Sequence, residues 1–166
     1  MITNFLQLQK VCNHLNLSAD IVHFVEHHLA HLAAAYYTRP EDLFEEKVLG
    51  LTCDGAGDGI SATVSICEQN SLNRIASSDR HTSLGKLFSR TTMILGMKPW
   101  EHEYKLMGMA PYADLERTEK ATNIFRKILA VDKETLEFKN LTNLSMNYTY
   151  EYLRDSFEGI RFDVIS

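Results

Sequence analysis

The sequence contains only three cysteines, Cys12, Cys53 and Cys67, and no C-x-x-C pair. Its first residues lack the basic-then-apolar order of a signal peptide. Sparse cysteines without a secretion signal predict reduced thiols and a cytoplasmic location. The apolar runs are too short to span a bilayer, so no membrane partner is expected.

Basic residues are in the minority. Lysine and arginine total 17 against 22 aspartate and glutamate residues, which gives a formal net charge of −5. That balance excludes a general electrostatic attraction to nucleic acid, and no nucleic-acid partner is expected. With 45% hydrophobic and 23% charged residues, the composition is that of a globular protein and excludes disordered or low-complexity classes. A length of 166 residues suits one domain or part of one.

The order of apolar patterns predicts an α/β domain. A β-branched and aromatic run predicts a buried strand at 21–26, and the alanine-rich segment after it predicts a helix at 27–38. Further strands are expected at 47–53, 60–68 and 71–78, with a turn at 54–59 joining the first two as an antiparallel hairpin. Helical patterns and a small hairpin complete the second half. The helices are expected at 84–95, 103–109, 118–131 and 146–157, and the hairpin around 136–138.

Histidines are concentrated near the N-terminus, with four of the seven between His23 and His31. His27 and His31 are four residues apart, so a helix places both imidazoles on one face. Two neutral imidazoles at that spacing suit zinc, iron or nickel, with a third ligand from elsewhere. Asp54, at the end of the 47–53 strand, is the candidate. The alternative is a polar helix start in which the histidines cap and pack.

Glycines are concentrated in the predicted turn that follows this strand. Backbone N–H groups of such a turn can bind phosphate, which makes Gly55, Gly57, Asp58 and Gly59 candidate nucleotide contacts. No Gly-Lys-Ser/Thr follows, and a strand rather than a helix comes next, so this is neither a Walker loop nor a dinucleotide fingerprint. The alternative is a tight hairpin with ordinary Asp-Gly turn chemistry.

Four sequence blocks, in this order, resemble the carbamoyltransferases of the nodulation and antibiotic-biosynthesis type. They are HHLAHLAAA at 27–35, CDGAGDG at 53–59, SLGKLF through GMKP at 83–99, and EYKLMGMAPY at 103–112. The last block is the most distinctive. The sequence departs from the family pattern at Ala113, where a glycine is usual.

The resemblance implies part of an actin-like, sugar-kinase-type lobe: an α/β fold with a mixed sheet, an antiparallel hairpin and packed helices. It implies that His27, His31 and Asp54 hold a metal, iron rather than zinc, and that an aspartate expected beyond Ser166 completes the site. The chain is accordingly expected to be a fragment, 1–166, of the N-terminal metal- and nucleotide-binding domain. The C-terminal domain that makes carbamoyl-adenylate is expected to be absent from it.

The implied activity is transfer of a carbamoyl group from carbamoyl phosphate, through carbamoyl-adenylate made with ATP, to a hydroxyl of a small-molecule acceptor. His28 is the nearest spare imidazole for a catalytic base, and a buried structural histidine is the alternative. Lys105 is a candidate phosphate contact or a solvated lysine, and Gly108 is placed with the nucleotide site. Four aromatic residues are expected in the core, with ligand stacking as the alternative: Tyr36, Tyr37, Phe88 and Trp100. A non-catalytic nucleotide- and metal-binding module and a metal-dependent hydrolase remain alternative functions.

Overall fold

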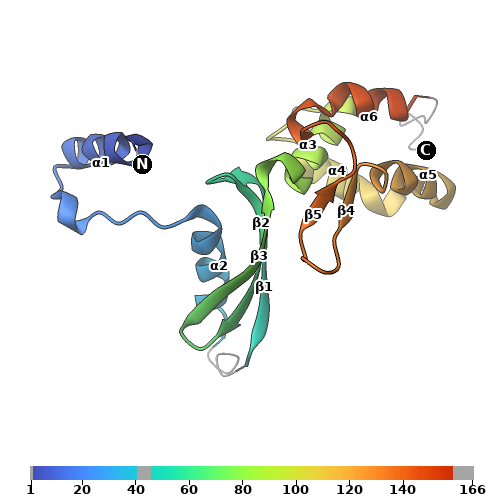
Figure 1. Cartoon of the computed structure of the whole chain (residues 1–166). Helices are drawn as coiled ribbons and strands as arrows, with labels where there is room; N and C mark the ends of the chain where they lie inside the picture. Colours follow the sequence, from blue (N-terminus) through green and yellow to red (C-terminus); the bar gives the residue numbers. More distant parts are fainter. Residues whose placement is uncertain (1, 41–45, 159–166) are drawn as a thin grey trace.

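The computed structural model describes residues 2–40 and 46–158 and contains two antiparallel sheets with helices packed around them (Figure 1). The larger sheet is a meander of β1 (Val48–Gly57), β2 (Ile60–Glu68) and β3 (Ser71–Asp79) in that order. These strands and the antiparallel β1–β2 hairpin confirm the prediction. The predicted mixed sheet is not found in the described part of the chain, where the paired strands are antiparallel.

The turn between β1 and β2 is shorter than the sequence predicted. Strand β1 continues to Gly57, which pairs with Ile60, so that only Asp58 and Gly59 form the turn. Their φ angles of 50° and 86° are those of the tight hairpin turn that favours Asp-Gly. The register shifts between Cys53 and Gly57, so the strand is irregular where the acidic and glycine residues lie.

Helix α2 (His27–Tyr37) packs against one face of this sheet, beside β1 (Figure 1). The sequence predicts that this helix packs on the sheet through Leu29, Leu32, Ala33 and Tyr36. Leu32 and Tyr36 are buried and Ala33 is half-buried, whereas Leu29 is exposed. The backbone of Gly50 makes the close approach possible, because a Cβ there would overlap with the Leu32 side chain. The predicted helix and its position on the sheet are therefore confirmed, with a narrower contact face than expected.

The predicted strand at 21–26 is wrong. Residues 22–26 are irregular, and they follow a short 3₁₀ turn, η1 (Ala19–Ile21). The large apolar side chains of Phe24 and Val25 are exposed. A β-branched run becomes a strand only when another strand pairs with it, and the described residues provide no partner here. An unpredicted helix, α1 (Ile2–Leu15), precedes this segment and lies away from the sheet in Figure 1.

The second half of the chain contains the remaining helices and the small sheet. The helices are α3 (Leu84–Ile94), α4 (Glu103–Met109), α5 (Leu115–Phe125) and α6 (Tyr150–Ser156), and the strands are β4 (Leu129–Val131) and β5 (Phe138–Asn140). The helix predicted to reach residue 131 is wrong at its end, because α5 stops at Phe125 and β4 pairs with β5. A short apolar run cannot be assigned to helix or strand by periodicity alone. No described helix is both long and apolar enough to cross a membrane.

The second half of the chain has a hydrophobic core of its own, separate from the contact between α2 and the larger sheet. Its buried residues are Leu87, Ile128, Met146, Leu153 and Phe157. The pattern of the 118–131 segment predicts an inward apolar face of Ala121, Ile124, Phe125, Ile128 and Leu129. Ile128 lies in this core, and the other four residues pack against it. The inward face was thus predicted correctly although the helix ends earlier than expected.

Candidate metal centre

Three side chains from α2 and β1 converge at one end of the sheet. The ligand atoms of His27, His31 and Asp54 all lie within 4.8 Å of one another. Nε2 of His27 is 2.7 Å from Oδ2 of Asp54 and 3.1 Å from Nε2 of His31. Nε2 of His31 is 3.7 Å from the same carboxylate oxygen. The structure therefore brings together the three residues that the sequence proposed as metal ligands.

Two carboxylates fix the start of α2 at His27. The carboxylate of Glu26 accepts hydrogen bonds from the backbone N–H groups of His28 (3.1 Å) and Leu29 (2.9 Å). Asp58, in the hairpin turn, accepts the backbone N–H of His27 at 2.9 Å. Acceptors at these positions satisfy N–H groups that the helix leaves unpaired, and their negative charge suits the helix N-terminus. The first turn of α2 is thus tied to the β1–β2 hairpin.

Two glycines make room for this arrangement. A Cβ at Gly57 would overlap with the imidazole ring of His27. A Cβ at Gly85, in the first turn of α3, would lie 2.9 Å from the backbone carbonyl carbon and oxygen of Asp54. The hydroxyl of Ser83 donates a hydrogen bond to that same carbonyl oxygen at 3.0 Å. Helix α3 therefore supports the backbone of Asp54, while Gly57 leaves space for the ring of His27.

The carboxylate of Asp54 is held in its ionised form. The hydrogen bond from the His27 side chain and a second one from the backbone N–H of Gly55 lower the pKa of Asp54 below its ordinary value of 3.8. The side chain of Asp54 is 42% exposed, and that of His31 is 56% exposed. An ionised carboxylate and two imidazoles are therefore accessible from solvent at one point.

This donor set fits a divalent metal ion. Two imidazole nitrogens and one carboxylate oxygen, with further coordination positions open, are typical of non-haem iron sites, and zinc uses the same ligand types. Separations of 2.7, 3.1 and 3.7 Å are compatible with ligand atoms that lie ~2.0–2.2 Å from a common point. His27, His31 and Asp54 can hold such an ion without a change of fold.

His28 is fully buried between α2 and the sheet. Its Nε2 lies 3.0 Å from the carbonyl oxygen of Ile60, and its Nδ1 lies 2.8 Å from the hydroxyl of Thr52. In the neutral ring, Nε2–H donates to the carbonyl and Nδ1 accepts from the hydroxyl. Both ring nitrogens are therefore hydrogen-bonded, which agrees with a structural role for a buried histidine. The role of His28 as catalytic base stays a prediction.

Four of the residues proposed as nucleotide contacts belong to the β1–β2 hairpin. Gly55 and Gly57 lie within β1 rather than in a turn. The carboxylate of Asp58 receives the His27 N–H, and Gly59 supplies the positive φ of the hairpin turn with open space around it. Phosphate binding by this segment stays a prediction.

Lys105 and Gly108 lie on α4, which packs on α3. The ammonium group of Lys105 is 5.9 Å from the centre of the Tyr104 ring, and both Lys105 and Gly108 are exposed. Neither takes part in the contacts of the histidine–aspartate cluster described above. Their assignment to a phosphate site stays a prediction.

The aromatic residues expected in the core divide into two groups. Tyr36 is buried, and Phe88 is half-buried. Tyr37 and Trp100 are exposed, at 43% and 77% respectively. The expectation is therefore wrong for both Tyr37 and Trp100. Trp100 lies in the loop between α3 and α4 and has a φ angle of 73°, which large side chains rarely adopt.

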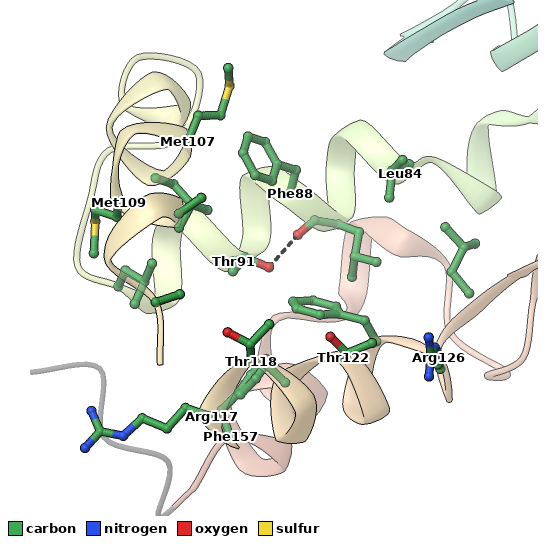
Figure 2. Close-up of a pocket in the computed structure, with 18 of the residues that line it drawn as sticks. Leu84, Phe88, Thr91, Met107, Met109, Arg117, Thr118, Thr122, Arg126 and Phe157 are labelled. Atoms are coloured by element: carbon green, nitrogen blue, oxygen red, sulfur yellow. Dashed lines mark hydrogen bonds between the residues drawn. The ribbon is translucent and has the colours of Figure 1, made fainter. Parts of the chain in front are cut away.

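An open apolar pocket of about 920 Å³ lies between α3, α4 and α5 (Figure 2). The pattern of the 84–95 segment places Leu84, Phe88 and Thr91 on one helix face. These three residues line the pocket together with Met107 and Met109. The Thr91 hydroxyl is engaged by the helix, since it donates to the Leu87 carbonyl at 3.0 Å. The sequence predicted the apolar faces of the 84–95 and 118–131 segments, but neither their convergence nor the contribution of α4. The pocket is distinct from the histidine–aspartate cluster.

Comparison with known proteins identifies a family whose sequence pattern this chain matches. The family described as "Carbamoyltransferase N-terminus" matches residues 5–164. An uncharacterized protein of Methanocaldococcus jannaschii is 30% identical over 141 residues, which are 72% of this chain and 26% of that protein. Nodulation protein NolNO of Sinorhizobium fredii is 36% identical over 93 residues, 56% of this chain and 13% of the relative. Nodulation protein NolO of Bradyrhizobium diazoefficiens is 30% identical over 105 residues, 63% of this chain and 18% of the relative. The chain thus spans about a quarter or less of the length of these relatives.

Proposed function

Because the chain belongs to the carbamoyltransferase N-terminus family, we propose that it takes part in the transfer of a carbamoyl group to a hydroxyl of a small-molecule acceptor. Carbamoyl phosphate is the proposed donor, with ATP used to form carbamoyl-adenylate. The observation that carries the proposal is the convergence of His27, His31 and Asp54 in a chain that matches this family over most of its length.

The proposed cofactor is a divalent metal, iron in preference to zinc, held by the three converging side chains. A metal bound there would act as a Lewis acid that stabilises negative charge on a carbamoyl or phosphate oxygen. The proposed architecture is one part of an actin-like, sugar-kinase-type lobe, which the β1–β2 hairpin and the position of Asp54 on it support.

The chain's own residues prepare this site. Ser83 and Gly85 hold the backbone of Asp54, and Gly57 gives the imidazole of His27 its space. The two carboxylates at the start of α2 keep that imidazole directed at β1. Such positioning by neighbouring groups is what preserves metal affinity in protein sites.

The acceptor hydroxyl needs a base, and His28 is the proposed group. It would need to release the Thr52 hydroxyl before Nδ1 could accept a proton. Binding of the nucleotide at Gly55, Gly57, Asp58, Gly59, Lys105 and Gly108 is proposed from the family resemblance.

Metal analysis of the purified chain, together with turnover of carbamoyl phosphate and ATP by a full-length member of the family, tests the proposal. We expect one metal ion per chain, and a loss of affinity of at least about 10-fold in His31→Ala and in Asp54→Asn. His81→Ala is the matched control, because His81 is exposed and hydrogen-bonded to Ser145, outside the cluster. Metal binding that is equal in all these variants would contradict the site. Metal-dependent hydrolysis without carbamoyl transfer would favour the hydrolase instead.

A further inference from the structure

Trp100 combines exposure with an unusual backbone conformation. It is 77% exposed, although indole is the largest apolar side chain, and its φ of 73° is unfavourable for a bulky residue. Such conformations persist where surrounding contacts impose them, and they concentrate at functional sites. Trp100 is also the single tryptophan of the sequence.

Hydrogen bonds hold the loop that carries Trp100. The backbone N–H of Trp100 donates to the carboxylate of Glu103 at 2.8 Å. Lys98 and His102 are joined twice: the His102 N–H donates to the Lys98 carbonyl, and the Lys98 N–H donates to Nδ1 of His102, both at 3.0 Å. The Met97 N–H donates to the Thr92 carbonyl at the end of α3. The backbone of Trp100 is therefore held by the fold before any ligand binds.

The indole lies beside the strand that carries the candidate metal ligand. Its Cη2 and Cζ3 atoms are 3.6 and 3.7 Å from the position that a Cβ on Gly55 would take. Gly55 directly follows Asp54 and donates its N–H to that carboxylate. These two atoms lie at the far end of the six-membered ring, and Trp100 is 77% exposed, so most of the side chain remains open to solvent.

We infer that Trp100 is a stacking platform for the adenine ring of the nucleotide proposed to bind at the His27–His31–Asp54 cluster; this inference rests on the proposed function. Stacking of a flat ring on an exposed aromatic side chain removes apolar surface from water and is therefore favourable. Every nucleic-acid base has a π face, so bases stack on aromatic side chains with little dependence on their identity. The carboxylate of Glu103, at the start of α4, accepts the backbone N–H of Trp100. Its negative charge disfavours a phosphate group beside Trp100 but not a neutral base. The base is therefore the part of the nucleotide that fits there.

Ligand-observed saturation-transfer NMR with AMP tests this inference on the metal-loaded chain, because the method detects weak binding. We expect the adenine H2 and H8 protons to receive more saturation than the ribose protons. We also expect AMP to quench the Trp100 fluorescence excited at the red edge, where adenine does not absorb, and ribose 5-phosphate to leave it unchanged. Trp100→Leu should weaken AMP binding by about 5- to 150-fold, and Trp100→Phe should retain part of it.

Three outcomes would overturn the assignment of Trp100 as a stacking platform. They are no saturation transfer to AMP from the metal-loaded chain, equal saturation of adenine by the chain and by Trp100→Leu, and stronger binding of a sugar such as glucose than of AMP. Metal binding is measured on the same samples. Intact metal binding with any of these results removes only the role of Trp100, whereas loss of metal binding removes the proposed function as well. Trp100→Leu should leave metal affinity unchanged.

Discussion

Gly57 illustrates how a single missing Cβ permits the geometry of the candidate centre. Its neighbour in space is the ring of His27, and a methyl group at position 57 would overlap with that ring. The nearby Gly59 has a different function, because its φ of 86° belongs to the hairpin turn and no atoms lie within 4 Å of its Cβ position. Two glycines of one short segment are thus required for different physical reasons.

Gly57→Ala is expected to displace the His27 imidazole and to reduce metal affinity by roughly 10- to 100-fold, as for other changes to groups that orient a ligand. Gly59→Asn is the control, because asparagine tolerates a left-handed backbone and meets no neighbour there. Titration of both variants with Co(II) or Fe(II) provides the measurement. Equal affinities would show that His27 does not bind the metal.

Glu26 connects the start of α2 to β3. Burial raises the pKa of Glu26, but hydrogen bonds from the backbone N–H groups of His28 and Leu29 and the ion pair with Arg74 outweigh burial and lower this pKa below 4.5 overall. The interaction therefore stabilises the fold fully when pH is above 4.5. Its contribution falls as pH drops below 4.5 and is lost once pH passes the lowered pKa of the folded state.

Glu26→Gln is expected to lower the free energy of unfolding by about 0.5–1 kcal/mol at pH 7, since the amide still accepts hydrogen bonds but carries no charge. The difference from the unmodified chain should shrink as pH falls below 4.5. Urea unfolding at pH 7 and near pH 3 measures it. Glu68→Gln, which removes an exposed ion pair with Lys47, should have little effect at pH 7. A difference for Glu26→Gln that is independent of pH would contradict the assigned cause.

At the scale of elements, the packing of α3 on β1 supports the candidate centre. Ser83 caps α3 by accepting the Lys86 N–H, and the same hydroxyl donates to the Asp54 carbonyl. One turn of helix therefore begins directly against the strand at Asp54. Gly85 permits this contact, because its neighbours are backbone atoms, which cannot move aside as a flexible side chain can.

Gly85→Ala is expected to push α3 away from β1, to destabilise the chain by about 1–3 kcal/mol, and to weaken metal binding through Asp54. Gly108→Ala is the matched control: it also replaces a helical glycine, but no atom lies within 4 Å of its Cβ position. That control should be neutral or more stable by up to about 1 kcal/mol. Thermal unfolding and metal titration of the two variants test the pair. Similar behaviour of both variants would argue against the α3–β1 contact.

At the scale of the whole molecule, the proposed reaction needs more than one cluster of ligands. Acyl transfer requires both substrates to be positioned, which can contribute ~7–11 kcal/mol to lowering the barrier. The 166 residues span about a quarter or less of the length of the relatives described above. The polypeptide around the cluster in a longer protein would supply the remaining positioning.

The 166-residue chain by itself is therefore expected to bind metal, to bind ATP weakly, and to transfer no carbamoyl group to a hydroxyl acceptor. A turnover assay with added iron or zinc, run beside a full-length member of the family, measures this. Turnover by the chain at a comparable rate would contradict the expectation. Inactivity of both proteins would favour a non-catalytic binding module.

Local chemistry made several features predictable from the sequence. The alanine- and leucine-rich segment from His27 forms a helix, and the four-residue spacing places His27 and His31 on one face, because helical periodicity depends only on near neighbours. The apolar runs at 47–53 and 60–68 form a hairpin around the glycine-rich segment between them for the same reason.

Other features were decided only by the tertiary structure. Whether residues 22–26 and 129–131 are strands depends on a partner strand, which is absent among the described residues for the first and is β5 for the second. The burial of His28 depends on Thr52 and Ile60, more than twenty residues away along the chain. The exposure of Trp100 likewise follows from how its loop meets β1. Pairing and burial are set by which distant segments meet, and a local sequence pattern does not contain that information.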